Sequence, residues 1–147
     1  MKPLLRVLLL LLVVVVAVPA QQPMPRAAFA AKTVAILHDE KTSEASDGAH
    51  EQLQRWGHFT IVDDADSADI VLRFDKKMDR EQKNSQSTDE KGATTWSAGM
   101  TFSSQVHMRA YLKGSDTPFY TTQTGDSKKK AGENCVTNFE KAWLDAR

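Results

Sequence analysis

The densest group of possible cation ligands lies between residues 63 and 69. Asp63, Asp64, Asp66 and Asp69 place four carboxylates within seven residues. Calcium takes about six to eight oxygen ligands, and an EF-hand loop needs a central glycine and a final glutamate. Neither residue is in register here. The pattern therefore favours an acidic turn, in which Asp66 or Ser67 caps a short helical stretch, over a calcium site.

A second candidate metal is zinc, because His50 and Glu51 stand together on an expected helix. The zinc motif His-Glu-x-x-His requires a second histidine where this chain has Gln54. His38, at the end of an expected strand, could approach His50 or His58, but spacing alone does not show it. Convergence of these histidines with the acidic turn would indicate a metal site or an enzyme. Without it, a histidine on a helix surface is the ordinary interpretation.

Ser103, Ser104 and His107 could supply a nucleophile and a base. If they lie on a strand, Ser103 and His107 share a face but stand about 13 Å apart, since a strand rises about 3.3 Å per residue. That is too far for a hydrogen bond, and no Gly-x-Ser-x-Gly elbow is present. We therefore expect no catalytic residue, no cofactor-binding residue and no metal ligand.

Two other residue types could serve a ligand or a redox reaction. Trp96, Phe102, Tyr111 and Tyr120 could form an aromatic patch, although a division between the core and the sheet edge is the favoured interpretation. The single cysteine, Cys135, has no partner for an internal disulfide. Its place on the apolar stripe of an expected helix indicates a small buried hydrophobic residue.

Residues 1–20 have the pattern of an export signal. Lys2 and Arg6 provide the positive start, an apolar run of twelve residues follows, and Val18 and Ala20 suit a signal peptidase. Such a run is too short to span a bilayer core of about 30 Å. We predict cleavage before Gln21 and a mature protein that is periplasmic or secreted, with no stable membrane span.

The mature chain is nearly neutral. Removal of Lys2 and Arg6 leaves seventeen basic residues against nineteen acidic ones, a net charge of −2 over 127 residues. A protein that grips phosphates normally carries a basic patch, and the only basic triplet spans residues 128–130. The charge argues against a nucleic-acid partner, and the length suits a single domain.

Hydrophobic periodicity predicts an α/β (α+β) domain over residues 33–147. Leu53 and Trp56 close one helical stripe, and Gly57 suits a left-handed C-cap. A mixed sheet of about five strands, with two helices packed on one face, would bury Trp56 beside Trp143. The expected order is β-α-β-β-β-β-α, with strands at 33–38, 59–62, 68–74, 94–112 and 117–124, a first helix at 44–56, and a second with the stripe Ala131, Cys135, Phe139 and Trp143.

Two stretches lack such periodicity. Residues 21–32 are rich in alanine and proline and predict a flexible lead. Residues 75–92 carry five basic and five acidic residues, and Met78 is their only aliphatic residue. A stretch of this composition buries too little apolar surface to offset backbone ordering, which costs about 1–2 kcal/mol per residue. We therefore expect a mobile hairpin loop at about 75–92.

One segment resembles a group of bacterial envelope domains. It begins with a buried strand at Val34–Leu37 and a helix ending in Leu53-Gln54-Arg55-Trp56-Gly57, and it continues through Phe59-Thr60-Ile61-Val62-Asp63-Asp64 to Ala68-Asp69-Ile70-Val71-Leu72. This succession is similar to the N-terminal domain of the Tol-system propeller protein, the lipoprotein activators of penicillin-binding proteins and the curli-secretion lipoprotein. It looks closest to short exported bacterial proteins that consist of this unit alone. The chain has neither the lipid-anchor cysteine nor the propeller of the larger proteins, so their individual roles are not implied.

The resemblance implies protein–protein contact in the envelope rather than catalysis. With no cluster of catalytic residue types, the chain is predicted to be an exported, non-catalytic domain that binds another envelope component, possible contacts being a sheet edge or the long loop. The alternative is a small extracytoplasmic enzyme or metal-binding protein whose site follows no recognised pattern.

Overall fold

The computed structural model describes residues 23–88 and 94–147, and the side chains of all of these except residues 79–102. The predicted signal peptide at residues 1–20 lies outside the described residues. Among the described residues, no helix is long and apolar enough to cross a membrane.

Five strands form one mixed sheet in the spatial order β2-β1-β3-β4-β5. β1 runs parallel to both β2 and β3, and β4 pairs antiparallel with β3 and β5. The strands are β1 (Thr33–His38), β2 (Thr60–Ile61), β3 (Ile70–Thr88), β4 (Thr94–Leu112) and β5 (Tyr120–Thr124).

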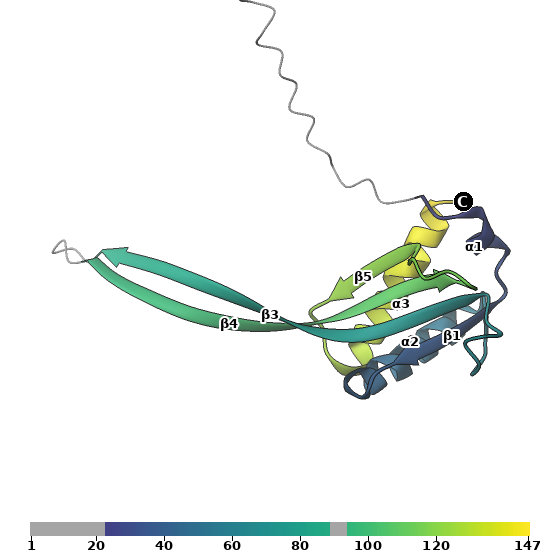
Figure 1. Cartoon of the computed structure of the whole chain (residues 1–147), viewed down its shortest axis with the longest axis horizontal. Helices are drawn as coiled ribbons and strands as arrows, with labels where there is room; N and C mark the ends of the chain where they lie inside the picture. The colour runs from purple at the N-terminus through teal and green to yellow at the C-terminus, as the bar shows by residue number, and fades with distance from the viewer. Residues whose placement is uncertain (1–22, 89–93) are drawn as a thin grey trace, which may run out of the picture.

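Two long helices, α2 (Ser43–Trp56) and α3 (Lys128–Asp145), cover one face of the sheet (Figure 1). α2 ends at Gly57, whose φ of 69° favours glycine, and the Gly57 N–H donates to the Leu53 carbonyl at 2.9 Å. The mixed α/β fold and the order of strands and long helices confirm the sequence prediction. The structure adds two short helices, α1 (Arg26–Ala30) and η1 (Glu40–Thr42).

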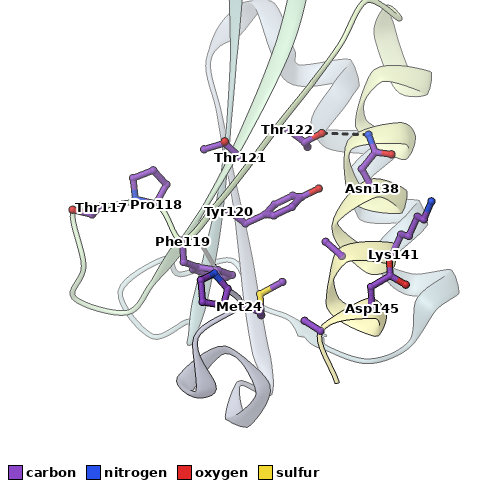
Figure 2. Close-up of a pocket in the computed structure, with 13 residues that line it drawn as sticks. Met24, Thr117, Pro118, Phe119, Tyr120, Thr121, Thr122, Asn138, Lys141 and Asp145 are labelled. Carbon is purple, nitrogen blue, oxygen red and sulfur yellow. Dashed lines mark hydrogen bonds between the residues drawn. The ribbon is translucent and has the colours of Figure 1, made fainter. Parts of the chain in front are cut away.

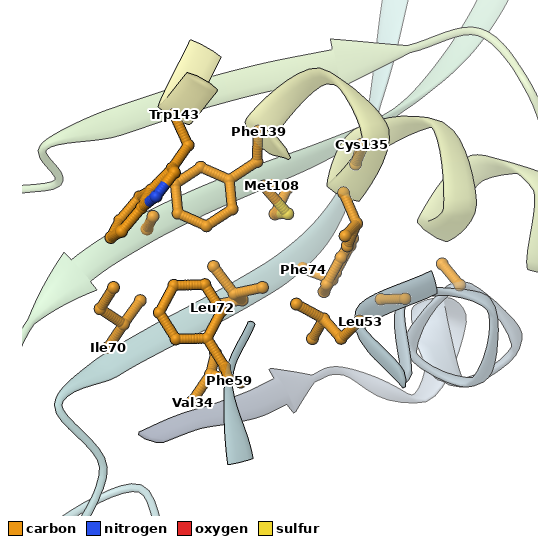
Figure 3. Close-up of a cluster of buried hydrophobic side chains, with 14 of the residues drawn as sticks. Val34, Leu53, Phe59, Ile70, Leu72, Phe74, Met108, Cys135, Phe139 and Trp143 are labelled. Carbon is orange, nitrogen blue, oxygen red and sulfur yellow. The ribbon is translucent and has the colours of Figure 1, made fainter. Parts of the chain in front are cut away.

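The hydrophobic core lies between the sheet and the two long helices, α2 and α3. Figure 3 shows Leu72 and Met108 of the sheet in one cluster with Leu53 of α2 and Trp143 of α3. Trp143 is only 1% exposed and meets the ring of Trp56 edge-on, with 6.0 Å between ring centroids. The predicted pairing of the two tryptophans is confirmed, although Trp56 is only partly buried.

α2 and α3 approach closely because two glycines lie at their contact. A Cβ at Gly48 would overlap the backbone carbonyl of Lys129, and a Cβ at Gly132 would overlap that of Ala45. Side chains at these two positions would force the helices apart. This close packing was not predicted, because the two glycines are far apart in the chain and show no shared pattern.

Two stretches are more regular than their composition indicates. Within residues 21–32, expected to be a flexible lead, α1 forms and Ala28 is fully buried. Residues 75–88, expected to be part of a mobile loop, instead continue β3 and pair with residues 94–107 of β4. Strand pairing satisfies backbone hydrogen bonds whatever the side chains are, so polar composition did not identify this strand. Residues 89–92 of the expected loop lie outside the described residues.

Candidate functional site

Two aspartates of the acidic turn, Asp64 and Asp69, accept hydrogen bonds from backbone N–H groups. The Asp69 carboxylate accepts hydrogen bonds from the N–H groups of Lys32 at 2.9 Å and Thr33 at 3.1 Å, and the Asp69 N–H donates to Thr33 Oγ1 at 2.9 Å. The two backbone N–H donors hold the pKa of Asp69 below its ordinary value. Asp64 accepts from the N–H of Asp66 at 3.0 Å. The cluster therefore forms a turn and fastens the start of β3 to the start of β1.

The histidines considered as metal ligands lie at separate places. His38 Nδ1 is 2.9 Å from the carbonyl oxygen of the next residue, and His50 Nε2 is 3.0 Å from Gln54 Nε2. The His58 ring stacks on Trp56 with 5.3 Å between centroids. Within residues 23–78 and 103–147, whose side chains the structure describes, no three His, Cys, Asp or Glu side chains form a group that could hold a metal ion. The convergence that would have favoured a metal site or an enzyme is therefore not found there.

β4 keeps Ser103 and His107 apart. The strand register places Ser103 opposite Asp79, and places His107 opposite Asp75 on one side and Gln123 on the other. Four positions along a strand correspond to about 13 Å. Ser103 and His107 therefore lie on one strand, as the sequence predicted. They are too far apart to act as a hydrogen-bonded pair.

Cys135 is fully buried on α3. Its burial raises the pKa of the thiol to about 12. Because the thiolate is the reactive form of cysteine, a thiol with this pKa is inert at neutral pH. The structure confirms the interpretation of Cys135 as a buried hydrophobic residue.

The sheet divides the aromatic residues considered as a ligand patch. The Tyr120 ring packs against Phe139 on the helix side, with 5.2 Å between centroids. On the opposite face, the Arg73 guanidinium lies over the Tyr111 ring at 5.4 Å from its centroid. The two tyrosines cannot share one binding site. Trp96 and Phe102 lie farther out on β4.

A groove of about 850 Å³ lies between β5 and the C-terminal half of α3 (Figure 2). The large apolar side chains that line it are Met24, Phe119 and Tyr120. At its upper end in Figure 2, Asn138 Nδ2 donates to Thr122 Oγ1 at 3.3 Å. The charged residues along the α3 side are Lys141 and Asp145. The groove was not predicted, since its lining comes from three segments that only the fold brings together.

The groove borders one of the two edges of the sheet, and these edges differ. β2 has only two residues and runs into the acidic turn, whereas β5 has five residues, none of them charged or proline. Short length, charge and proline are the devices that protect an edge strand from pairing with another chain. In the described sheet β5 lies at the end of the strand order, so its outer edge is unpaired. β5 is therefore the edge better suited to accept a further strand.

Solved structures that are loosely similar to this chain include the two described below. No protein-family model and no curated protein sequence matches the chain. A PDZ domain protein from Parabacteroides distasonis is 14% identical over 73% of this chain, which spans 30% of that protein, with a TM-score of 0.38. Rare lipoprotein B from Shewanella oneidensis is 16% identical over 78% of this chain and 86% of its own, also with a TM-score of 0.38.

Proposed function

We propose that this protein is an exported, non-catalytic domain that binds another component of the cell envelope by accepting an extended segment of a partner protein along β5. The observation that carries this proposal is the unpaired, uncharged edge of β5 beside an open groove. In strand addition, main-chain hydrogen bonds supply affinity, and pockets for alternate side chains supply specificity. The outer edge of β5 offers main-chain groups, and the groove beside it offers room for side chains.

The geometry defines the kind of segment that fits. β5 offers five residues, so the added segment needs about five residues in an extended conformation. Side chains on its helix-facing side enter the groove, where Met24 and Phe119 favour apolar groups. Side chains on its other face remain in solvent.

The test is capture of the partner by tagged mature protein from an envelope fraction of the native host. Thr121→Lys places a charge at an exposed position on β5, and Thr60→Lys places the same charge at an exposed position on β2, the opposite edge. We expect the original chain and Thr60→Lys to capture the same protein, and Thr121→Lys to lose it. The captured partner should then slow amide hydrogen exchange in β5.

Other outcomes would contradict the proposal at different points. Equal capture by all three proteins would show that β5 is not the contact. Capture of nothing above a tag-only control would contradict the binding function itself. Export is tested separately by the intact mass of the protein produced in its host, which should correspond to a chain that begins at Gln21.

A further inference from the structure

The outer parts of β3 and β4 form an arm that projects from the rest of the domain (Figure 1). β1 pairs with β3 only as far as Phe74, and β5 pairs with β4 only as far as Val106. Beyond these points the register continues for twelve pairs, from Lys77 opposite Gln105 to Thr88 opposite Thr94. At about 3.3 Å per residue the arm is about 40 Å long. We define the arm as residues 77–88 and 94–105.

Strand geometry assigns the residues of the arm to two faces. Residues of one parity on a strand share a face, and paired residues of two antiparallel strands share it too. The register pairs even-numbered positions with even-numbered ones throughout. Phe74 and Met108, which are buried against the helices, belong to this even-numbered face. The arm therefore continues the face that forms the core of the domain.

All apolar residues of the arm occupy that even-numbered face. Odd-numbered positions hold only lysine, aspartate, glutamate, serine, threonine, glutamine and one glycine. Met78, the first apolar residue beyond the domain, is 73% exposed. The apolar residues of the arm are Met78, Trp96, Ala98, Met100 and Phe102.

The charges of the arm are also separated by face. The even-numbered positions carry Arg80, with Lys76 at the base of the arm, and no carboxylate. Asp79 and Glu81 are both odd-numbered, where Lys77 and Lys83 balance them. One face is thus apolar and cationic, and the other is polar with no net charge.

We propose that the even-numbered face of the arm docks on the anionic surface of a lipid bilayer. Amphipathic elements bind membrane surfaces when apolar side chains enter the interface and basic side chains meet acidic headgroups. Tryptophan is favoured at that depth, and Trp96 stands on this face. A second copy of the chain fits less well, since the even-numbered face of one copy offers no carboxylate to pair with Lys76 and Arg80 of the other.

The same docking would stabilise an element that is weak by itself. A two-stranded ribbon is marginally stable in water, because neither of its faces is covered. Contact with the bilayer would remove one apolar face from water while the polar face stays hydrated. This surface is separate from the β5 groove, so the lipid contact and the proposed protein contact can be tested independently.

The first experiment measures binding of the mature protein to sedimenting vesicles. The vesicles are phosphatidylcholine alone, or phosphatidylcholine with about one third phosphatidylglycerol, and we expect at least about tenfold tighter binding to the second. Met100→Asp and Thr101→Asp add the same charge at adjacent positions on opposite faces. We expect Met100→Asp to weaken binding at least about tenfold and Thr101→Asp to change it less than about threefold. No binding to anionic vesicles, or equal effects of the two variants, would overturn the proposal.

The second experiment compares the cations of the two faces. Each basic residue near an anionic membrane strengthens binding by roughly fivefold. Neutralising Lys76 and Arg80 to glutamine should therefore weaken binding by about 25-fold. Neutralising Lys77 and Lys83 in the same way should have a clearly smaller effect. An equal loss for both pairs would show that net charge, and not this face, controls the binding.

Two controls separate lipid docking from folding and from self-association. Circular dichroism and thermal unfolding should be unchanged in Met100→Asp, because the substitution lies outside the packed domain. Sedimentation velocity without lipid should show a monomer for the original chain and for the variant. A dimer that Met100→Asp dissociates would assign the face to a second copy of the chain and overturn the lipid proposal. Thr121→Lys should bind vesicles as the original chain does.

Discussion

β3 and β4 pass through two very different regions of the molecule. In their inner halves, the even-numbered face lies under α2 and α3, and Phe74 and Met108 are almost fully buried. In their outer halves, the same strands form the arm, which projects away from both helices in Figure 1. Met78 lies on the same face of β3 four residues after Phe74, and it is already 73% exposed.

The comparison shows that alternation and burial are separate properties. Alternation of apolar and polar residues indicates that one face of a strand packs against something apolar. It does not identify the packing partner. The inner face is covered by helices of the same chain. For the outer face we propose a lipid surface. The following predictions test this division, from the largest expected effect to the smallest.

Removal of the largest buried side chain should affect the inner region most. Trp143→Ala should lower the free energy of unfolding by about 3–5 kcal/mol, because it deletes an indole packed between sheet and helices. Trp56→Ala should cost clearly less, since Trp56 is only partly buried. Urea denaturation monitored by circular dichroism measures both. Equal costs would mean that the degree of burial does not control stability on this face.

The two regions can be compared with one residue type on one strand. Met108→Ala should destabilise the domain by about 2–5 kcal/mol, because Met108 is fully buried. Met100→Ala, at the same parity on β4, should change stability by less than about 0.5 kcal/mol. Thermal and urea unfolding of the lipid-free protein provide the measurement. A large cost at Met100 would show that the arm packs in solution, contrary to its separation from the domain.

α2 and α3 cover the inner part of the sheet, and their packing depends on their close approach to each other. Gly132→Ala should destabilise by about 1–3 kcal/mol, since the added methyl group meets the backbone of Ala45. Gly125→Ala is the matched control, because a Cβ there meets no atom within 4 Å. It should change stability by less than about 0.5 kcal/mol. If both variants unfold at the same denaturant concentration, the helices can separate without loss of stability.

The burial of Cys135 on α3 predicts that the free energy of unfolding depends on pH. Its folded pKa of about 12 lies above the ordinary value of 9.0, so the folded state favours the protonated thiol. The stabilisation is complete below about pH 9 and is lost as the pH rises toward 12. At pH 10 the loss should be about 1 kcal/mol relative to neutral pH. Cys135→Ala should lack this component, so the difference between the two unfolding curves against pH isolates it.

The smallest expected loss of stability follows removal of the arm. Replacement of residues 77–105 by an Asn-Gly turn should lower the free energy of unfolding by no more than about 1 kcal/mol, since a shorter connection reduces the closure entropy by about 0.6 kcal/mol per halving of its length. Vesicle binding should be lost in the same protein. Failure of the shortened chain to fold would show that the arm packs on the domain.

The sequence determined the elements whose signals are local. The stripe ending at Trp56, the C-cap at Gly57 and the alternation from Val106 to Leu112 each follow from spacing within one segment, and the structure contains these elements in the predicted order. The turn at the acidic cluster was predicted as well. The short helical stretch that Asp66 or Ser67 was expected to cap is absent, because residues 65–67 form a turn and Asp69 binds the backbone of the strand β1 instead. Helix and strand periods are short, so a single segment is enough to reveal them.

Tertiary structure alone decided which segments meet. The strand order, the contact of Gly48 and Gly132 with the opposite helix, and the groove beside β5 depend on residues far apart in the chain. The strand character of residues 75–88 also came from pairing, since their polar composition gave no local signal while β4 supplied a partner for every position. Pairing energy arises between segments rather than within them, which is why the arm and the unpaired edge of β5 became visible only in the folded molecule.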